Sequence, residues 1–124
     1  MENLKTIEDC AIATGRDPKI QPEVSHLLKK DRKKVIADYW LPIVIEAINK
    51  SIPPDWANGL EPKYSIWFNV VEDKNKPSGF GLSYLDYVGT DTDTIVGSRL
   101  TFRSIPGLKY AWKQFPDLFE EVYL

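Results

Sequence analysis

The chain has 124 residues, of which 16 are basic and 18 acidic, so its formal net charge is −2. Hydrophobic residues make up 43% and charged residues 27%, which is typical of a globular domain and excludes disordered and collagen-like chains. The longest apolar run is far too short for a membrane span, and the first residues lack the pattern of a signal peptide. We therefore expect a single domain, 1–124, with no membrane partner.

The single cysteine, Cys10, permits no internal disulfide, which favours a reducing, cytoplasmic location. A domain that coats nucleic acid is usually strongly basic, so nucleic-acid binding here would need a local basic patch. Aromatic residues make up 12% of the chain, including four Trp. Such side chains supply either a core or the anchors of an interface.

The first expected element is a short helix that begins after Thr6. The Thr6 hydroxyl can cap it, Glu8 and Asp9 suit the positive end of its dipole, and Gly15 is placed to end it in a left-handed conformation. A longer helix is predicted over residues 26–50, where Pro42 predicts a kink. Its predicted core stripe is Ile36, Tyr39, Trp40, Ile43, Ala47 and Ile48.

After a turn-rich segment, the hydrophobic period changes from that of a helix to that of a strand. Residues 63–71 and 80–88 alternate apolar and polar side chains, and residues 98–103 predict a third strand with Leu100 and Phe102 on one face. Polar segments at 72–79 and 89–94 separate them. The pattern predicts a three-stranded antiparallel meander.

The last predicted helix follows Ser104, its expected N-cap, with Pro106 in the first turn and a kink expected at Pro116. The element order is thus α-α-β-β-β-α. It indicates an α+β domain with its helices packed on one face of a small antiparallel sheet.

The segment G-S-R-L-T-F-R-S at 97–104, followed by K-Q-F-P-D-L-F at 113–119, resembles a group of small proteins of unknown activity. They occur in gut Bacteroidetes and in their phages and prophages. Tyr110, Lys113, Gln114, Asp117 and Leu118 are among the residues that match the pattern of that group. The resemblance implies a phage or mobile-element setting in a bacterial cytoplasm and implies no mechanism.

Catalytic chemistry finds little support in the sequence. His26 is the only histidine, and without a second histidine or a cysteine pair a zinc site is not expected. No local context supports a nucleophilic pair of Cys10 and His26. We therefore predict no catalytic residue, no metal, no cofactor and no enzymatic activity.

Two loops resemble ligand-binding motifs only in part. Asp91 and Asp93 resemble the start of a calcium loop, but Val96 and Phe102 stand where its glycine and glutamate belong, which favours a solvated turn. Residues 79–81, Gly-Phe-Gly, lack the other residues of a phosphate-binding loop, and they open a strand where such a loop must open a helix. We interpret them as a turn followed by a strand that bends or lies close to another backbone.

Two groups are candidate binding surfaces. The first is a basic run at the start of the long helix, which is either a solvated or internally paired face, a site for an acidic protein, or a nucleic-acid site. Its residues are Lys29, Lys30, Arg32, Lys33 and Lys34, and the acidic candidates for internal pairing are Asp117, Glu120 and Glu121. The second is an aromatic and basic sheet face of Trp67, Tyr87, Arg99 and Arg103, whose alternative is an ordinary solvated face.

Two functions follow as hypotheses. The first is a non-catalytic protein-interaction module that binds an unidentified host or phage protein. The second is a weak nucleic-acid-binding accessory protein that uses the basic run and the sheet aromatics. A sheet of three strands also leaves edges that a second copy could cover, so a homodimer is a further hypothesis.

Overall fold

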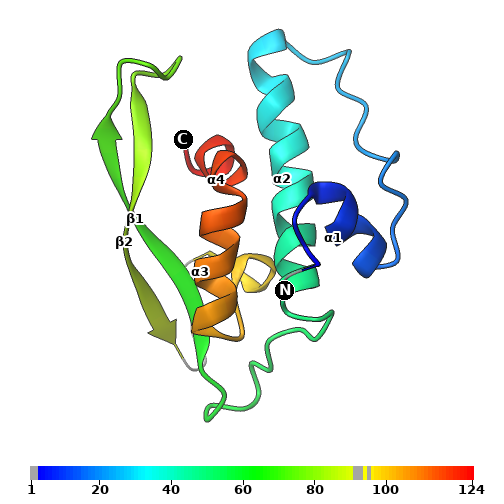
Figure 1. Ribbon diagram of the computed structural model, residues 1–124, viewed down its shortest axis with the longest axis vertical. Coiled ribbons are helices and arrows are strands. Elements are labelled where there is room, and N and C mark those ends of the chain that lie inside the picture. Colours follow the sequence, from blue (N-terminus) through cyan, green and yellow to red (C-terminus); the bar gives the residue numbers. More distant parts are fainter. Residues whose placement is uncertain (1–2, 91–93, 95) are drawn as a thin grey trace.

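The computed structural model describes residues 3–90, 94 and 96–124, so Asp91 and Asp93 of the expected calcium-type loop lie outside the described residues. Four α-helices, one 3-10 helix and a β-hairpin make up the described part of the chain (Figure 1). In chain order these are α1 (Ile7–Ala13), α2 (Lys29–Ile48), β1 (Lys63–Glu72), β2 (Phe80–Thr90), the 3-10 helix η1 (Ser98–Leu100), α3 (Ile105–Gln114) and α4 (Pro116–Tyr123).

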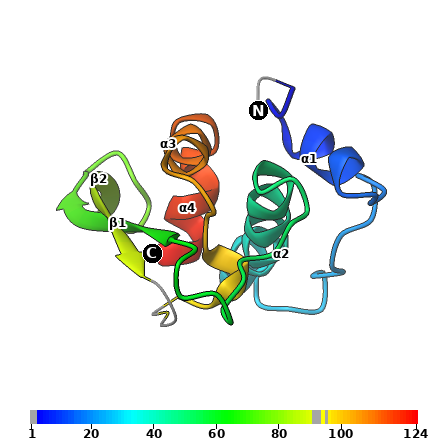
Figure 2. The same ribbon diagram turned by 90° about the horizontal axis from the view of Figure 1, so that it is seen from below.

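The elements form layers, with the hairpin on one side and α1 on the other. Helices α3 and α4 lie against one face of the hairpin, α2 lies behind them, and α1 packs on the far side of α2 (Figures 1 and 2). This arrangement confirms the predicted α+β fold with helices on one face of a small antiparallel sheet.

Strands β1 and β2 pair in antiparallel register, with Ile66 opposite Tyr87 and Phe68 opposite Tyr84. Between these pairs the register shifts by one residue. The expected third strand is reduced to a single antiparallel bridge of Phe102 with Tyr64, because residues 98–100 turn into η1 instead of extending. Both backbone hydrogen bonds of that bridge are present, at 2.9 and 2.7 Å.

Aromatic rings join the sheet to the C-terminal helices. Phe68 of β1 lies with its ring centroid 4.9 Å from that of Trp112, 5.7 Å from Phe119 and 5.3 Å from Tyr123. Phe119 is almost fully buried, at 1% exposed. Several of the aromatic residues of the chain therefore form the core between the hairpin and the helices.

The local capping predictions are confirmed. The Thr6 hydroxyl accepts from the Asp9 N–H and the Asp9 carboxylate accepts from the Thr6 N–H, a complete capping box. The Ser104 hydroxyl accepts from the Gly107 N–H, and Gly15 has a φ of 77°. At Pro116 a kink within one helix was predicted, and the structure has two separate helices, since α3 ends before this residue and α4 begins with it.

The central helix α2 is buried on more than its predicted stripe. It continues through Pro42, and Leu41, Val44 and Ile45 are buried although they lie outside that stripe. The reason is the layering: Trp40 and Ile43 pack against α1, while Leu41, Val44 and Ile45 belong to the core shared with the sheet and α4.

The turn prediction for residues 79–81 is also confirmed. Gly79 has a φ of 81°, which favours glycine, and β2 starts at the next residue. Gly81 lies against a side chain of α4 rather than against another backbone, because a Cβ there would stand 3.4 Å from Glu120 Oε1. Glu120 in turn accepts from the N–H of Leu82 at 3.3 Å and from Lys76 Nζ at 2.7 Å, which ties the hairpin to α4.

Candidate functional site

The hairpin has one covered and one uncovered face, and Trp67 lies on the uncovered one. Paired residues of an antiparallel sheet share a face, so Trp67 and its partner Asp86 lie opposite the core-facing pair of Ile66 and Tyr87. Trp67 is 57% exposed, and Asp86 is exposed beside it. A tryptophan in this position contributes little to the core and is available to a partner.

Tyr87 does not join Trp67 on the uncovered face, contrary to the sequence-based expectation. Its ring is half-buried and packs edge-to-face on Tyr64, with the centroids 5.6 Å apart. The register shift between Trp67 and Phe68 sets which residues of β2 face the helices, and it turns Tyr87 inward. Alternation along the sequence cannot reveal such a shift.

The two arginines also leave the expected sheet face, because residues 98–100 form η1. Arg103 lies near the end of α2, where its Nε donates to Glu61 Oε1 at 3.5 Å and its backbone N–H donates to Asn49 Oδ1 at 3.0 Å. Arg99 is exposed and lines a cleft against α2. The four predicted residues therefore lie at four separate places in the fold.

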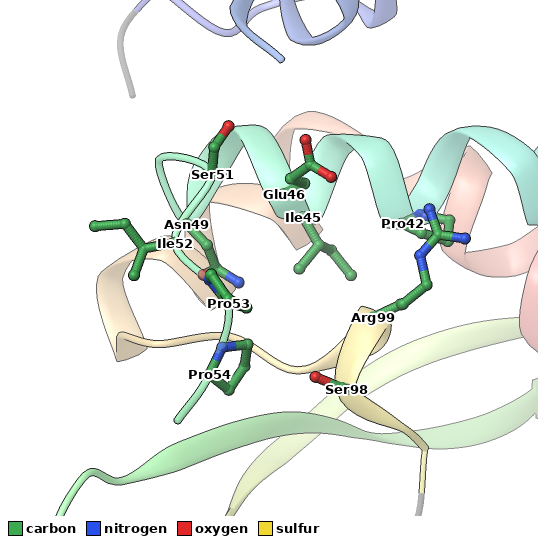
Figure 3. Close-up of a pocket in the computed structure, with 10 residues that line it drawn as sticks. All are labelled: Pro42, Ile45, Glu46, Asn49, Ser51, Ile52, Pro53, Pro54, Ser98 and Arg99. Carbon is green, nitrogen blue, oxygen red and sulfur yellow. The ribbon is translucent and has the colours of Figure 1, made fainter. Parts of the chain in front are cut away.

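The cleft beside Arg99 lies between the C-terminal half of α2, η1 and the segment that follows α2 (Figure 3). Its volume is about 260 Å³. Half of the ten residues that line it are aliphatic or proline, namely Pro42, Ile45, Ile52, Pro53 and Pro54. In Figure 3 the side chain of Ile45 points down into this space from α2.

Most of the polar side chains that line the cleft form hydrogen bonds with other residues of the chain. Glu46 accepts from both terminal nitrogens of Arg16, at 2.8 and 3.2 Å, and its carboxylate turns away from η1 in Figure 3. The Ser98 hydroxyl accepts from Trp56 Nε1 at 2.9 Å, which leaves its own O–H able to donate. Arg99 makes no hydrogen bond or ion pair with any residue that the structure describes.

The basic run occupies the N-terminal turns of α2 and is only partly paired. Arg32 donates to the carbonyls of Leu27 and Ser25, and Lys34 pairs with Asp38 at 3.0 Å and donates to the Val122 carbonyl. The acidic residues of the C-terminal helix, which are the candidates for internal pairing, form no described ion pair with the run, and Glu120 pairs with Lys76. Lys29, Lys30 and Lys33 remain exposed.

A wide groove of about 620 Å³ lies between α2 and α4, and Lys33 is the one residue of the basic run that lines it. Ile36 and Trp40 of α2, Ile7 of α1 and Leu118 of α4 supply its apolar floor. Its rim carries Lys33 and Lys76 together with Asp117, Glu120 and Glu121, so the charges of both signs lie close to one another.

For the described part of the chain, the structure bears on two kinds of chemistry, metal binding and the reactivity of the cysteine. No cluster of three or more His, Cys, Asp or Glu side chains there could hold a metal ion. Cys10 is fully buried, and this burial, with a smaller contribution from the charge of Asp9, raises the pKa of its thiol to about 11. A thiol with that pKa is a poor nucleophile at neutral pH.

The fold places these surfaces on a small α+β domain whose β-hairpin is covered on one side. A comparison of the chain with protein families, curated proteins and solved structures finds no match. None of the helices within the described ranges has both the length and the apolar character that crossing a membrane requires.

Proposed function

We propose that this protein is a non-catalytic protein-interaction module that binds its partner through the uncovered face of the β1–β2 hairpin. The observation that carries the proposal is Trp67, which exposes 57% of its surface in the middle of a strand. Tryptophan is the residue type most enriched among interface anchors, because it buries a large area with few rotatable bonds. Val71, further along the same strand, is a second apolar side chain that is partly exposed, at 41%.

The edge of the hairpin adds a second reason. Within the described residues no strand pairs with the outer edge of β2, and the Leu82 N–H of that edge is taken by Glu120 Oε1, so the edge beyond Leu82 is open to an added strand. The strands of this hairpin are long, with 10 residues in β1 and 11 in β2. An occupant that adds a strand would gain hydrogen bonds along this edge.

The proposed setting is the cytoplasm of a bacterium that carries a phage or mobile element, which the sequence resemblance supports. The partner would be a host or phage protein. A second copy of the chain that pairs along β2 is the competing occupant, and the molecular mass of the purified protein in solution distinguishes the two.

Affinity capture from a lysate of the native host, with nuclease present, tests the proposal. The wild type should retain a stoichiometric protein, and Trp67→Ala should lose it while remaining folded. Ile12→Ala is the matched control, because Ile12 is also an exposed apolar residue, at 67%, and lies on α1 at the opposite side of the molecule. Equal capture by the Trp67→Ala variant would overturn the proposed face.

Nucleic-acid binding is the second candidate, and it is favoured by Lys29, Lys30 and Lys33, which are exposed at one end of α2. Such a site would bind RNA or DNA through phosphate contacts, and its affinity would fall steeply with salt. Replacing these three lysines by Ala should abolish binding to a labelled single strand at 50 mM salt. Undetectable binding by the wild type under that condition would exclude this function.

A further inference from the structure

The cleft beside Arg99 is separate from the hairpin face and combines two features. Part of its wall is apolar, with Pro42, Ile45 and Pro54 among the residues there, and Arg99 also lines it. Figure 3 shows the Arg99 side chain rising from η1 toward Pro42 of α2. The cleft therefore offers an aliphatic surface and a cation at its edge.

Among the described residues that line the cleft, Arg99 carries the one charge that has no ion-pair partner. The other ionised side chain in its lining is Glu46, and Arg16 holds that carboxylate through two hydrogen bonds. A guanidinium presents a planar fork of donors that matches a carboxylate. The Ser98 hydroxyl, which lines the same cleft, is a further donor.

The size and charge of the cleft restrict what it can hold. Its volume of about 260 Å³ lies below the roughly 300–1,000 Å³ of drug-sized sites, so the cleft suits a small ligand. One uncompensated cation suits a monoanion, whereas a phosphate dianion would need further donors.

We propose that this cleft binds a carboxylate attached to a short aliphatic group, with the carboxylate on Arg99 and the aliphatic part against Ile45 and Pro54. Two sources share this chemistry: a free branched-chain carboxylic acid and the C-terminal residue of a peptide that ends in an aliphatic side chain. The site lies outside the hairpin surface, and its occupancy does not depend on Trp67.

The test is an NMR titration of the full chain with 4-methylpentanoate, with 4-methylpentanamide as the uncharged analogue of the same shape. We expect saturable shifts at Ile45, Ile52 and Arg99, with a dissociation constant of roughly 0.1–1 mM, the range that a ligand of this size reaches. The amide should bind at least about tenfold more weakly, because it cannot form the charge-assisted contact.

Variants show whether Arg99 is the anchor. Arg99→Ala should weaken binding of the acid at least about tenfold and leave the fold unchanged, because Arg99 is exposed. Lys109→Ala is the matched control, since it removes an exposed positive charge from α3, away from the cleft, and it should bind as the wild type does.

A second pair of ligands separates the two sources. An acetylated tripeptide that ends in leucine with a free carboxylate is compared with its C-terminal amide. Tighter binding of the free-carboxylate peptide than of 4-methylpentanoate assigns the cleft to peptide C-termini, and binding of the small acid alone assigns it to free acids. The proposal is overturned if the amides bind as tightly as the acids, if Arg99→Ala retains the affinity, or if no shift saturates.

Discussion

The side-chain amide of Asn49 makes backbone hydrogen bonds with the segment around Thr101 that a neighbouring strand would otherwise make. Its Nδ2 donates to the Thr101 carbonyl at 2.9 Å, and its Oδ1 accepts from the Arg103 N–H at 3.0 Å. The amide thereby pairs with the backbone on both sides of Phe102, whose own N–H and carbonyl pair with Tyr64. This arrangement fixes the end of α2 to the segment after η1, and with it the position of Arg99 over the cleft.

Asn49→Ala should lower the free energy of unfolding by about 2–4 kcal/mol, because it removes two hydrogen bonds at a buried site and leaves backbone groups unpaired. Urea denaturation measures the change. Asn69→Ala is the control, since Asn69 is exposed on β1 and should change stability by less than about 0.5 kcal/mol. Equal effects of the two substitutions would contradict a structural role for the Asn49 amide.

Phe119→Ala should lower the free energy of unfolding by about 3–5 kcal/mol, because it leaves a cavity among Phe68, Trp112 and Tyr123. The near-UV circular dichroism of the aromatic cluster should fall with it. Phe80→Ala removes a ring that is 46% exposed and serves as the comparison, with an expected loss below about 1.5 kcal/mol. A similar loss from both variants would argue against a core at this position.

Stability should fall between pH 9 and pH 11 because of Cys10, whose thiol pKa is raised by burial to about 11. Below pH 9 the thiol is protonated in both the folded and the unfolded chain, so its stabilising contribution is fully present. As the pH rises further, the unfolded chain releases a proton that the folded chain retains, which favours unfolding.

The free energy of unfolding should fall by about 2–3 kcal/mol across that interval because of this thiol, and the Cys10→Ala variant should lack this decrease. The comparison of the two proteins is needed because burial also raises the pKa of Tyr84 and Tyr123, and these phenols act equally in both. Parallel pH profiles of stability for the wild type and the variant would show that Cys10 does not titrate in this way.

Helix α2 can be stabilised at its N-terminus, because its N-cap residue, Leu28, makes no side-chain hydrogen bond and is 66% exposed. Leu28→Asp should raise the free energy of unfolding by about 1 kcal/mol, since the carboxylate accepts from free N–H groups and offsets the neighbouring lysines. Thermal and urea unfolding measure the gain. Leu60→Asp, at a loop residue that is 93% exposed, should show no such gain.

Local chemistry was well predicted from the residues alone. The capping box of Thr6, the N-cap at Ser104, the left-handed Gly15 and the turn at Gly79 each depend on a few adjacent residues, and the structure has all of them. The change of hydrophobic period at β1 likewise identified the sheet and the α+β class. Such features depend on interactions within one turn or one pleat, which a single chain segment contains.

The candidate sites were predicted less well, because each depends on contacts between distant segments. Arg99 was expected on a strand face, but the Asn49 amide and the single bridge at Phe102 replace the ladder that a third strand would need. The prediction for Tyr87 missed the register shift, which reverses the orientation of the residues beyond it.

The amino-acid sequence by itself determined where the helices and the hairpin form, because periodicity, caps and turn residues act over a few neighbouring positions. Only the tertiary structure decided which surfaces remain open. The α3–α4 pair covers one hairpin face and leaves Trp67 exposed on the other, and the end of α2 meets η1 to form the cleft at Arg99. Those outcomes depend on packing between elements that are far apart in the chain, and such packing leaves no periodic mark in the sequence.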